Sequence, residues 1–403
     1  MVKINGHKGA LSGIRVLDLT RVLAGPFCTM LLADMGAEVI KIETPGEGDD
    51  SRRYPPFIGE ESAYFMNLNR NKKSMVLNLK HAKAKEIFLN LVEKSDVIIE
   101  NFRPGTMEKL GIGYDTIKTR NPDIVYACIS GFGHSGPYKD LPGYDIIGQA
   151  MGGIMSITGW PESPPTRTGT AIADVLAGLN ACIGILAGLL SVRNGGAGQK
   201  IDIALVDSVV SAMETIIQIY LVENRIPQRT GNRYEFIYPY DTFKARDGWV
   251  IIAVGNNKLW EVFCNAVGRP ELLNDPHYRD NYDRVKAHVE VKQVVEEWSQ
   301  QKTVREIVDF MLSKKIPCAP IYTVKDVVEN EHIAGARRMI REIDHPVAGP
   351  VKVIGSPVNM SETPVEVASP APLLGQHSED VLKAILNLTD DELASLKNEK
   401  AIE

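Results

Sequence analysis

Apolar, strand-forming runs alternate with helical segments through the first half of the chain, and this alternation restricts the fold more than any other feature. The first such segment consists of IRVLDL (14–19), a helical stretch (24–37) and EVIKIE (38–43), which is the usual length of a βαβ unit. Further apolar runs follow as SMVLNL, DVIIEN, DIVYACIS and IDIALVD. Nearly continuous apolar strands separated by helices predict an α/β fold with a doubly wound, mostly parallel sheet whose two faces are covered.

The length of 403 residues exceeds that of one ordinary core and predicts more than one domain. We expect a large α/β domain over residues 1–228 and a smaller α+β domain over 229–326. In the smaller domain Asp247 and Gly248 separate two alternating runs, a pattern that favours a hairpin turn. Residues 327–403 contain Pro- and Gly-rich connectors before a C-terminal helix, and we expect this tail to return and complete the large domain.

Composition and charge exclude several functional classes. The net charge is −6 with both signs interspersed, so no basic face indicates a nucleic acid or an anionic membrane as partner. Five cysteines lie far apart without a CxxC pair, which predicts reduced thiols, no disulfide framework and no metal site. Residues 1–13 lack an apolar export signal. We expect a cytoplasmic protein whose partners are small molecules.

Residues 175–192 form an apolar run near the lower length limit for a membrane span. The run contains Asn180 and several small residues, and no second run of this kind accompanies it. Asn194, Gly195 and Gly196 then supply a sequence suited to ending a helix. We therefore expect a helix buried in a large core and no membrane partner.

Ligands of a doubly wound sheet bind at the carboxyl ends of its strands, so the loops after the strands are the places to search. None of these loops contains GxGxxG, GxxxxGK[ST], GxSxG or HExxH. Taken singly, their glycines and prolines need only shape turns. Together, Arg21, Arg103 and the glycine-rich segment 131–136 would place cations and N–H donors around one rim, which suits a phosphorylated ligand.

Asp174 lies where a polar loop passes into the apolar helix, in GTAIADVLAG. A carboxylate in the first turn of a helix is favoured by the helix dipole and should stay ionised easily. Position alone fits a helix cap as well as a catalytic carboxylate. Both interpretations remain open at this level.

Taken as a whole, the chain resembles the family III CoA-transferases, the group that includes formyl-CoA transferase and the carnitine-related CoA-transferases. The resemblance covers nearly the full chain and is carried by RVLDLTRVLAGPF, LLADMGAEVIKIE with a following GEGDDSR, NRNKKSMVLNLK, VIIENFRPGTMEKLG, ISGFGHSGPY, GTAIADVLAG, IPCAPIYTV and PAPLLGQHSEDVL. ENFRPG and GTAIADVLAG, in this order and at this separation, are specific signals. The resemblance implies an obligate homodimer of two interlocked ring-shaped subunits.

The resemblance also assigns roles to single positions. Asp174 falls at the family's catalytic aspartate. The positions that would hold coenzyme A are Leu23, Ala24, Leu77, Lys80, Asn101, Phe102, Arg103, Lys109, Gly143 and Tyr144. Gly255 begins the loop that covers the active site in the family and, with Asn256, would supply donors to an oxyanion. Two departures stand out: GNNK (255–258) replaces a run of glycines, and Thr44 replaces an arginine that contacts the nucleotide.

The implied reaction moves CoA from an acyl-CoA donor, such as succinyl-CoA or another short acyl-CoA, to a carboxylic acid through a mixed anhydride and an aspartyl-CoA thioester. CoA thioesters are then substrates, and no bound cofactor is needed. A related isomerase, α-methylacyl-CoA racemase, is one alternative, but its GlyHisAsp motif reads Gly143-Tyr144-Asp145 here, and only His134 offers a substitute base. A non-catalytic CoA-binding protein is another. Arg52 or Arg53 offers a hypothetical clamp for a second substrate carboxylate.

Overall fold

The computed structural model describes residues 9–403, and these form two compact units. Unit 1 is the described part of Met1–Ile154 together with Thr168–Ile217 and Asn330–Glu403, and unit 2 is Met155–Arg167 together with Gln218–Glu329. The range expected for the small domain, 229–326, lies within the second of these units. The expectation drawn from residues 1–13 depends mostly on residues 1–8, which lie outside the described part of the chain.

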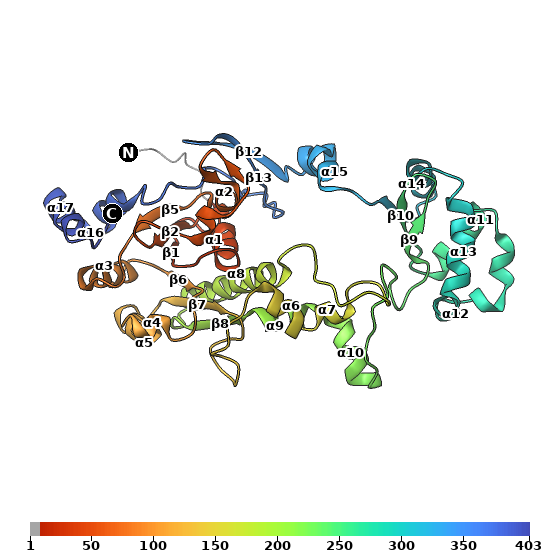
Figure 1. The fold of residues 1–403 in the computed structure, drawn as a ribbon, viewed down its shortest axis with the longest axis horizontal. Coiled ribbons are helices and arrows are strands. Elements are labelled where there is room, and N and C mark those ends of the chain that lie inside the picture. The colour runs from red at the N-terminus through yellow and green to blue at the C-terminus, as the bar shows by residue number, and fades with distance from the viewer. Residues whose placement is uncertain (1–8) are drawn as a thin grey trace. The chain divides into compact units, whose positions relative to one another are not determined.

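Unit 1 is built around a six-stranded parallel sheet (Figure 1). The strands are β1 (Arg15–Asp18), β2 (Glu38–Glu43), β5 (Lys73–Val76), β6 (Val97–Glu100), β7 (Val125–Ser130) and β8 (Lys200–Ala204). Their order is β5-β2-β1-β6-β7-β8, and each neighbouring pair runs parallel. The predicted doubly wound sheet is confirmed. The strand order reverses between β1 and β6, and this switch point is where such sheets bind ligands.

Successive residues of the central strands enter different cores, which explains why the strands are apolar throughout. Val16 packs with α1 (Ala24–Asp34) and α8 (Ile172–Arg193) on one face of the sheet. Leu17 packs on the other face with α3 (Ala82–Val92), α5 (Tyr114–Arg120), α16 (Ser378–Leu386) and α17 (Asp390–Asn398). Shorter elements of the same unit are β3 (Phe57–Ile58), β4 (Glu61–Ser62), α2 (Ala63–Asn69), α4 (Thr106–Lys109), α6 (Asp145–Met151) and α9 (Leu205–Ala212), with a 3-10 turn η1 (Asp50–Arg53) and a π-helical turn η4 (Glu331–Ala336).

The apolar run expected to form a fully buried helix is only partly covered. α8 runs alongside β7 and β8 (Figure 1) and turns its small residues toward α1 and the sheet. Leu179, Ile183 and Leu190 are exposed on its other side, so the expected burial in a core holds for one face of the helix only. Among the described residues α8 is long and apolar enough to cross a membrane, and α9 and α10 (Glu214–Glu223) pass that test only as a pair bent by 76°.

The tail, Asn330–Glu403, belongs to unit 1 and contains more regular structure than its Pro- and Gly-rich sequence indicates. The Ser378 hydroxyl accepts from the Val76 N–H at 3.1 Å, so α16 is fastened to the edge strand β5. The expected connectors contain an antiparallel hairpin, β12 (Ile340–His345) and β13 (Gly349–Ile354). The expected single terminal helix is two helices, because Asn387 leaves the helical region at φ +57° and a capping box at Thr389 starts α17.

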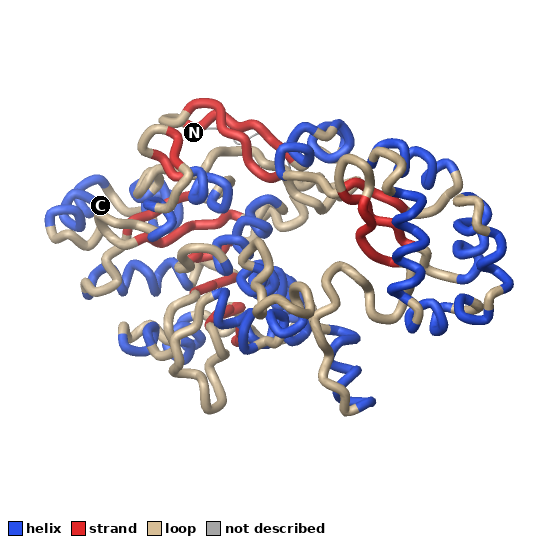
Figure 2. Tube along the Cα trace, turned by 45° about the vertical axis from the view of Figure 1, so that its right-hand side comes forward, coloured by secondary structure: helices blue, strands red, loops and turns tan. Residues whose placement is uncertain are grey.

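Unit 2 carries a small antiparallel sheet in the order β11-β10-β9, and Figure 2 shows its strands beside helices. The strands are β9 (Tyr240–Lys244), β10 (Trp249–Ala253) and β11 (Cys318–Pro320). The predicted hairpin at Asp247 and Gly248 joins β9 to β10. Its helices are α7 (Ile154–Ile157, at the unit boundary), α11 (Asn257–Ala266), α12 (Asn281–Lys286), α13 (His288–Ser299), α14 (Val304–Ser313) and α15 (Val324–Glu329), with short 3-10 turns η2 (Pro270–Asn274) and η3 (Pro276–Tyr278).

The contact between α8 and α1 depends on a glycine. A Cβ added at Gly178 would lie 2.6 Å from the Ala24 carbonyl oxygen, a backbone atom that has little room to move. A Cβ at Gly184, further along α8, would meet the Ile201 Cγ2 atom at 2.9 Å, the end of a flexible side chain. Only the first contact fixes the spacing of two backbones.

We therefore expect Gly178→Ala to lower the free energy of unfolding by about 1–3 kcal/mol through overpacking. The matched change Gly184→Ala should lower it much less, since Ile201 can move and alanine favours the helix. Denaturant unfolding of both variants measures the difference. Equal losses would contradict the close-contact argument.

Candidate active site

Asp174 lies at the edge of the sheet where the strands end. It occupies the first turn of α8, and Gly178, one turn later on the same helix face, packs on the first turn of α1. Side chains on a helix lean toward its N-terminus, so the Asp174 carboxyl lies above the start of α1. α1 follows β1 at the switch point, which brings Asp174 to the edge where a ligand is expected.

The environment of Asp174 does not fit a helix cap. Within residues 9–403 its side chain makes no hydrogen bond, and the residue is half-buried. The Ala173 N–H, in the first turn of α8, donates to Asp145 Oδ1 at 2.9 Å. Asp145 therefore accepts a hydrogen bond that a capping residue would otherwise accept. The position of Asp174 therefore leaves a carboxyl that no described residue uses.

Burial, and after it the negative charge of Asp145, raises the pKa of Asp174 to about 7. The expectation that the helix dipole would keep this group readily ionised was wrong, because loss of solvent and a nearby carboxylate outweigh the dipole. A carboxylate with a raised pKa is more basic once it is ionised. Such perturbed groups in a site are candidates for chemistry.

A buried pair that the sequence reasoning missed holds the segment before α8. Gln149 Nε2 donates to Asp145 Oδ2 at 2.7 Å, and Gln149 Oε1 accepts from the Thr168 N–H at 2.9 Å. Both side chains belong to α6 and are buried. The only signal in the sequence was that Asp145 completes the Gly143-Tyr144-Asp145 triplet.

Tyr64 of α2 is a second residue that the sequence reasoning missed. Burial, followed by the charge of Asp174, raises the pKa of Tyr64 to about 12, so the phenol is neutral and close enough to sense that carboxylate. Its ring makes an edge contact with Tyr54 at a centroid distance of 5.8 Å. No local pattern marks Tyr64, because the proximity comes from the folding of distant segments.

The loops after β1 and β6 are brought together as their sequences predict. Asn101 Oδ1 accepts from the Arg21 N–H, and Asn101 Nδ2 donates to the Arg21 carbonyl, both at 2.8 Å. The Arg21 guanidinium lies over the Phe102 ring, 5.5 Å from its centroid. Leu23 and Ala24 follow directly at the start of α1.

The other positions expected to hold CoA are distributed along the same edge. Gly143 packs on Gly131, since a Cβ at either residue would lie within 2.8 Å of the other's Cα. Tyr144 is 79% exposed, and Arg103, Lys109 and Lys80 are also exposed. Leu77 differs, because its side chain lies in the core and its backbone bridges to Ile402.

Gly255 and Asn256 belong to unit 2. Asn256 Oδ1 accepts from the Leu259 N–H at 2.9 Å and caps α11, which leaves the amide NH₂ as its free donor group. Gly255 is exposed, and an added Cβ would meet no described atom within 4 Å. Its φ lies outside the left-handed region, so the backbone there does not require glycine.

Arg52 is engaged within the protein. Its guanidinium donates to both oxygens of Glu43, at 2.8 and 2.7 Å, and lies 3.8 Å from the centroid of the Phe65 ring. Arg53 is half exposed and lies 3.3 Å from Asp50. The Arg52 guanidinium is therefore not free to bind the second carboxylate of a substrate.

Glu100, Cys128 and His134 place metal-ligand atoms within 4.8 Å of one another near the ends of β6 and β7. The Lys200 Nζ lies 3.1 Å from His134 Nδ1. A lysine that donates to Nδ1 leaves the proton on Nε2, and its charge repels a second cation. These three donor residues therefore do not favour a metal. The contact with Lys200 also engages Nδ1 of His134.

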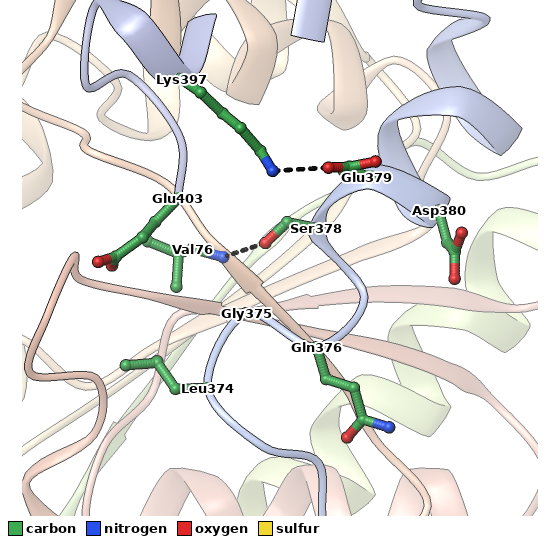
Figure 3. Close-up of a pocket in the computed structure, with 9 residues that line it drawn as sticks. All are labelled: Val76, Leu374, Gly375, Gln376, Ser378, Glu379, Asp380, Lys397 and Glu403. Atoms are coloured by element: carbon green, nitrogen blue, oxygen red, sulfur yellow. Dashed lines mark hydrogen bonds and ion pairs between the residues drawn. The ribbon is translucent and has the colours of Figure 1, made fainter. Parts of the chain in front are cut away.

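A hollow elsewhere in unit 1 does not mark this site. It has a volume of about 510 Å³ and lies at the end of the edge strand β5, where Figure 3 shows Val76, Ser378 and the Glu379–Lys397 ion pair. Its other lining residues include Asp380 and Glu403. None of the expected CoA positions lines it, and its acidic side chains do not suit a phosphorylated ligand.

Comparison with known proteins decides the family. The sequence profile described as CoA-transferase family III matches residues 11–378. The chain belongs to this family. It is 41% identical over 384 residues to the succinyl-CoA:mesaconate CoA-transferase of Haloarcula marismortui, covering 93% of this chain and 96% of that one. It is 39% identical over 387 residues to the succinyl-CoA:glutarate CoA-transferase of Mus musculus, covering 96% and 88%.

Solved structures agree with the family. A CAIB/BAIF family protein from Brucella suis superposes with a TM-score of 0.82 at 35% identity, covering 94% of this chain and 99% of that chain. A hypothetical protein from Mycobacterium tuberculosis gives 0.83 at 30% identity, covering 93% and 100%. The expected family and fold are confirmed, and the chain is a CoA-transferase with CoA thioesters as substrates.

The raised pKa of Asp174 makes the stability of this family III CoA-transferase depend on pH. The unfolded carboxyl ionises near 3.8 and the folded one near 7, so stability is fully present below the lower value and is lost as pH rises through the higher one. We expect Asp174→Asn to match the wild type near pH 4 and to be more stable by roughly 2–4 kcal/mol above pH 7. Denaturant unfolding across this range measures the difference, and a gain independent of pH would contradict the shift.

Proposed function

We propose that Asp174 is the nucleophile through which this enzyme moves CoA from an acyl-CoA donor to a carboxylic acid. The single observation that carries the proposal is a half-buried carboxyl without a hydrogen-bond partner among the described residues, at the start of α8 and next to the start of α1. Its pKa near 7 leaves about half of it ionised at neutral pH and makes the ionised half a stronger nucleophile.

Four acyl transfers complete the proposed reaction. Asp174 attacks the donor thioester carbon and expels the CoA thiolate, which gives a mixed anhydride. The thiolate attacks the Asp174 acyl carbon, releases the donor carboxylate and leaves an aspartyl-CoA thioester. The acceptor carboxylate then attacks this thioester and expels the thiolate again. Finally, the thiolate attacks the acceptor carbon of the new anhydride, so that acyl-CoA forms and Asp174 is regenerated.

Each tetrahedral intermediate requires donors for its oxyanion. α1 begins without a side-chain cap, and no described residue accepts from the N–H groups of Ala24 and Gly25. One well-placed donor is worth about 3–4 kcal/mol in such a transition state. The family resemblance assigns the second source to the loop that starts at Gly255, where the Asn256 amide is a free donor.

The substrates of relatives guide the choice of donor. Relatives are named for succinyl-CoA with mesaconate, glutarate and L-malate as acceptors. Their names support succinyl-CoA as donor and a small dicarboxylic acid as acceptor here. Arg52 is occupied by Glu43, so the second carboxylate of such an acid would need another partner.

We also infer a cytoplasmic homodimer. The five cysteines are free, which supports a reducing compartment. Ile183 on α8 is 64% exposed although it belongs to the most apolar helix, and α10 exposes Leu221 and Val222. Such surfaces support burial against a second copy, in the interlocked arrangement that the family resemblance implies.

Covalent capture tests the nucleophile directly. We expect incubation with succinyl-CoA, followed by removal of small molecules, to leave protein carrying CoA, and hydroxylamine to convert that residue into a hydroxamate at Asp174. Intact-mass and peptide mass spectrometry measure both products. A panel of other short acyl-CoA donors shows which donor forms the adduct.

Asp174→Asn is the matched control, and it should bind CoA but form no adduct. If no donor modifies the wild type and the α-proton of a 2-methylacyl-CoA exchanges with solvent, the enzyme is a racemase and the proposed mechanism is wrong. If Asp174→Asn still turns over, the nucleophile lies elsewhere. If neither variant turns over any donor while CoA binds, the protein is a binder.

The proposed homodimer predicts a mass effect. Ile183→Glu should shift the mass measured by light scattering after size exclusion from two chains toward one, because it buries a charge in the contact. Val289→Glu on α13 of unit 2 changes a side chain of similar exposure, 65%, and serves as control. A wild-type mass of one chain would contradict the dimer.

A further inference from the structure

The turn between β1 and α1 contains a backbone conformation that its residue type disfavours. Val22 has φ +69°, in the left-handed region, where a β-branched side chain is an outlier. Strain of this kind persists only when surrounding contacts determine the backbone, and it is found most often at functional sites. Val22 directly precedes Leu23 and Ala24, two of the positions expected to hold CoA.

Side chains from other segments hold the two residues before Val22 through their backbone atoms. Lys41 Nζ donates to the Thr20 carbonyl at 2.7 Å. Asn101 accepts from the Arg21 N–H and donates to the Arg21 carbonyl, both at 2.8 Å. Because these bonds reach main-chain atoms, they fix the path of the turn whatever its side chains do.

Asp49 holds Val22 itself. Asp49 Oδ1 accepts from the Val22 N–H at 3.1 Å and from the Ser51 N–H and hydroxyl at 2.8 and 2.7 Å. Its Oδ2 lies 2.8 Å from Lys41 Nζ, and both side chains are at most 1% exposed. The ion pair is therefore shielded from salt and water. It links the Asp49 carboxylate, which accepts from Val22, to the Lys41 ammonium, which donates to the Thr20 carbonyl.

The conformation of Val22 determines where α1 begins. Gly25, in the first turn of α1, packs so closely that an added Cβ would lie 2.2 Å from Thr20 Cβ. The same turn of α1 contacts α8 one turn below Asp174. A change of Val22 to negative φ would redirect the free N–H groups of this turn relative to Asp174.

We propose that Asp49 is a positioning residue for the acyl-CoA, acting through Val22: its buried carboxylate keeps Val22 left-handed and so presents the start of α1 to the thioester. This inference rests on the proposed function and adds to it a residue that does not touch the substrate. Glycine adopts positive φ without strain. The need for Asp49 should therefore decrease when residue 22 is glycine.

A double-mutant cycle in the full-length enzyme tests this coupling. We expect Asp49→Ala to lower kcat/KM for succinyl-CoA at least tenfold, because the place of the thioester and the N–H donors beside it both depend on Val22. Combined with Val22→Gly, the same change should lower kcat/KM less than threefold relative to Val22→Gly alone. An equal fall in both backgrounds would show that Asp49 has only a structural role and would overturn the proposal.

If Asp49→Ala does not fold, Val22→Pro provides the test, because proline has φ near −65° and no N–H but leaves the Asp49–Lys41 pair in place. Calorimetry should show the Kd for CoA raised at least tenfold, with a thermal midpoint within a few degrees of the wild type. An unchanged Kd in the folded variant would overturn the proposal.

Lys315→Gly is the matched control, since Lys315 also has positive φ, +59°, but follows α14 in unit 2. It should leave kcat/KM unchanged, and a fall in kcat/KM equal to that of the Asp49 variant would count against a specific role. Asp174→Ala separates the two proposals. Turnover by Asp174→Ala would refute the proposed function, whereas an inactive Asp174→Ala with no coupling in the cycle would refute only the role of Asp49.

Discussion

Two buried ion pairs beneath the carboxyl edge of the sheet hold the geometry on which the rest of the site depends. Lys72 Nζ lies 3.2 Å from Asp18 Oδ2, and Lys41 Nζ lies 2.8 Å from Asp49 Oδ2, with all four side chains almost completely buried. Removing one partner of such a pair typically costs about 3–5 kcal/mol, because the remaining charge is left uncompensated. The Lys72 pair ties the end of β1 to the segment before β5, and the Lys41 pair ties β2 to the loop that follows it.

The carboxylates at this edge of the sheet differ in whether a lysine lies beside them, and this difference separates structural from chemical roles. Burial opposes the ionisation of Asp18 and Asp49, yet Lys72 and Lys41 outweigh it and hold the pKa of each below its usual range. Asp174 has no cation beside it, so loss of solvent, followed by the charge of Asp145, raises its pKa. The ion pairs fix the frame, while Asp174 retains the unpaired charge that a nucleophile needs, at the expense of stability.

Local patterns in the sequence predicted the features that depend on neighbours along the chain. The six strands, the βαβ units and the hairpin at Asp247 follow from periodicity and turn chemistry, and the place of Asp174 follows from one polar-to-apolar transition. The roles of Val22, Tyr64 and Asp145 were not predicted, because they arise from contacts between segments that are distant along the chain. The apolar composition of residues 175–192 also overstated the burial of α8, since composition reports apolar side chains but not what covers them.

The fastening of the tail to the edge strand affects the order in which the chain can fold. The His377 N–H donates to the Ser74 carbonyl, and the Ser74 N–H donates to His377 Nδ1, across 303 residues of sequence. During synthesis from the N-terminus, most of the parallel sheet is made long before α16, so the face of β5 stays uncovered while unit 2 can already assemble. Such long-range pairing delays the closing step and favours slow folding. While the chain is still bound to the ribosome, β5 is therefore not covered by α16. We expect help from chaperones to matter most in this state.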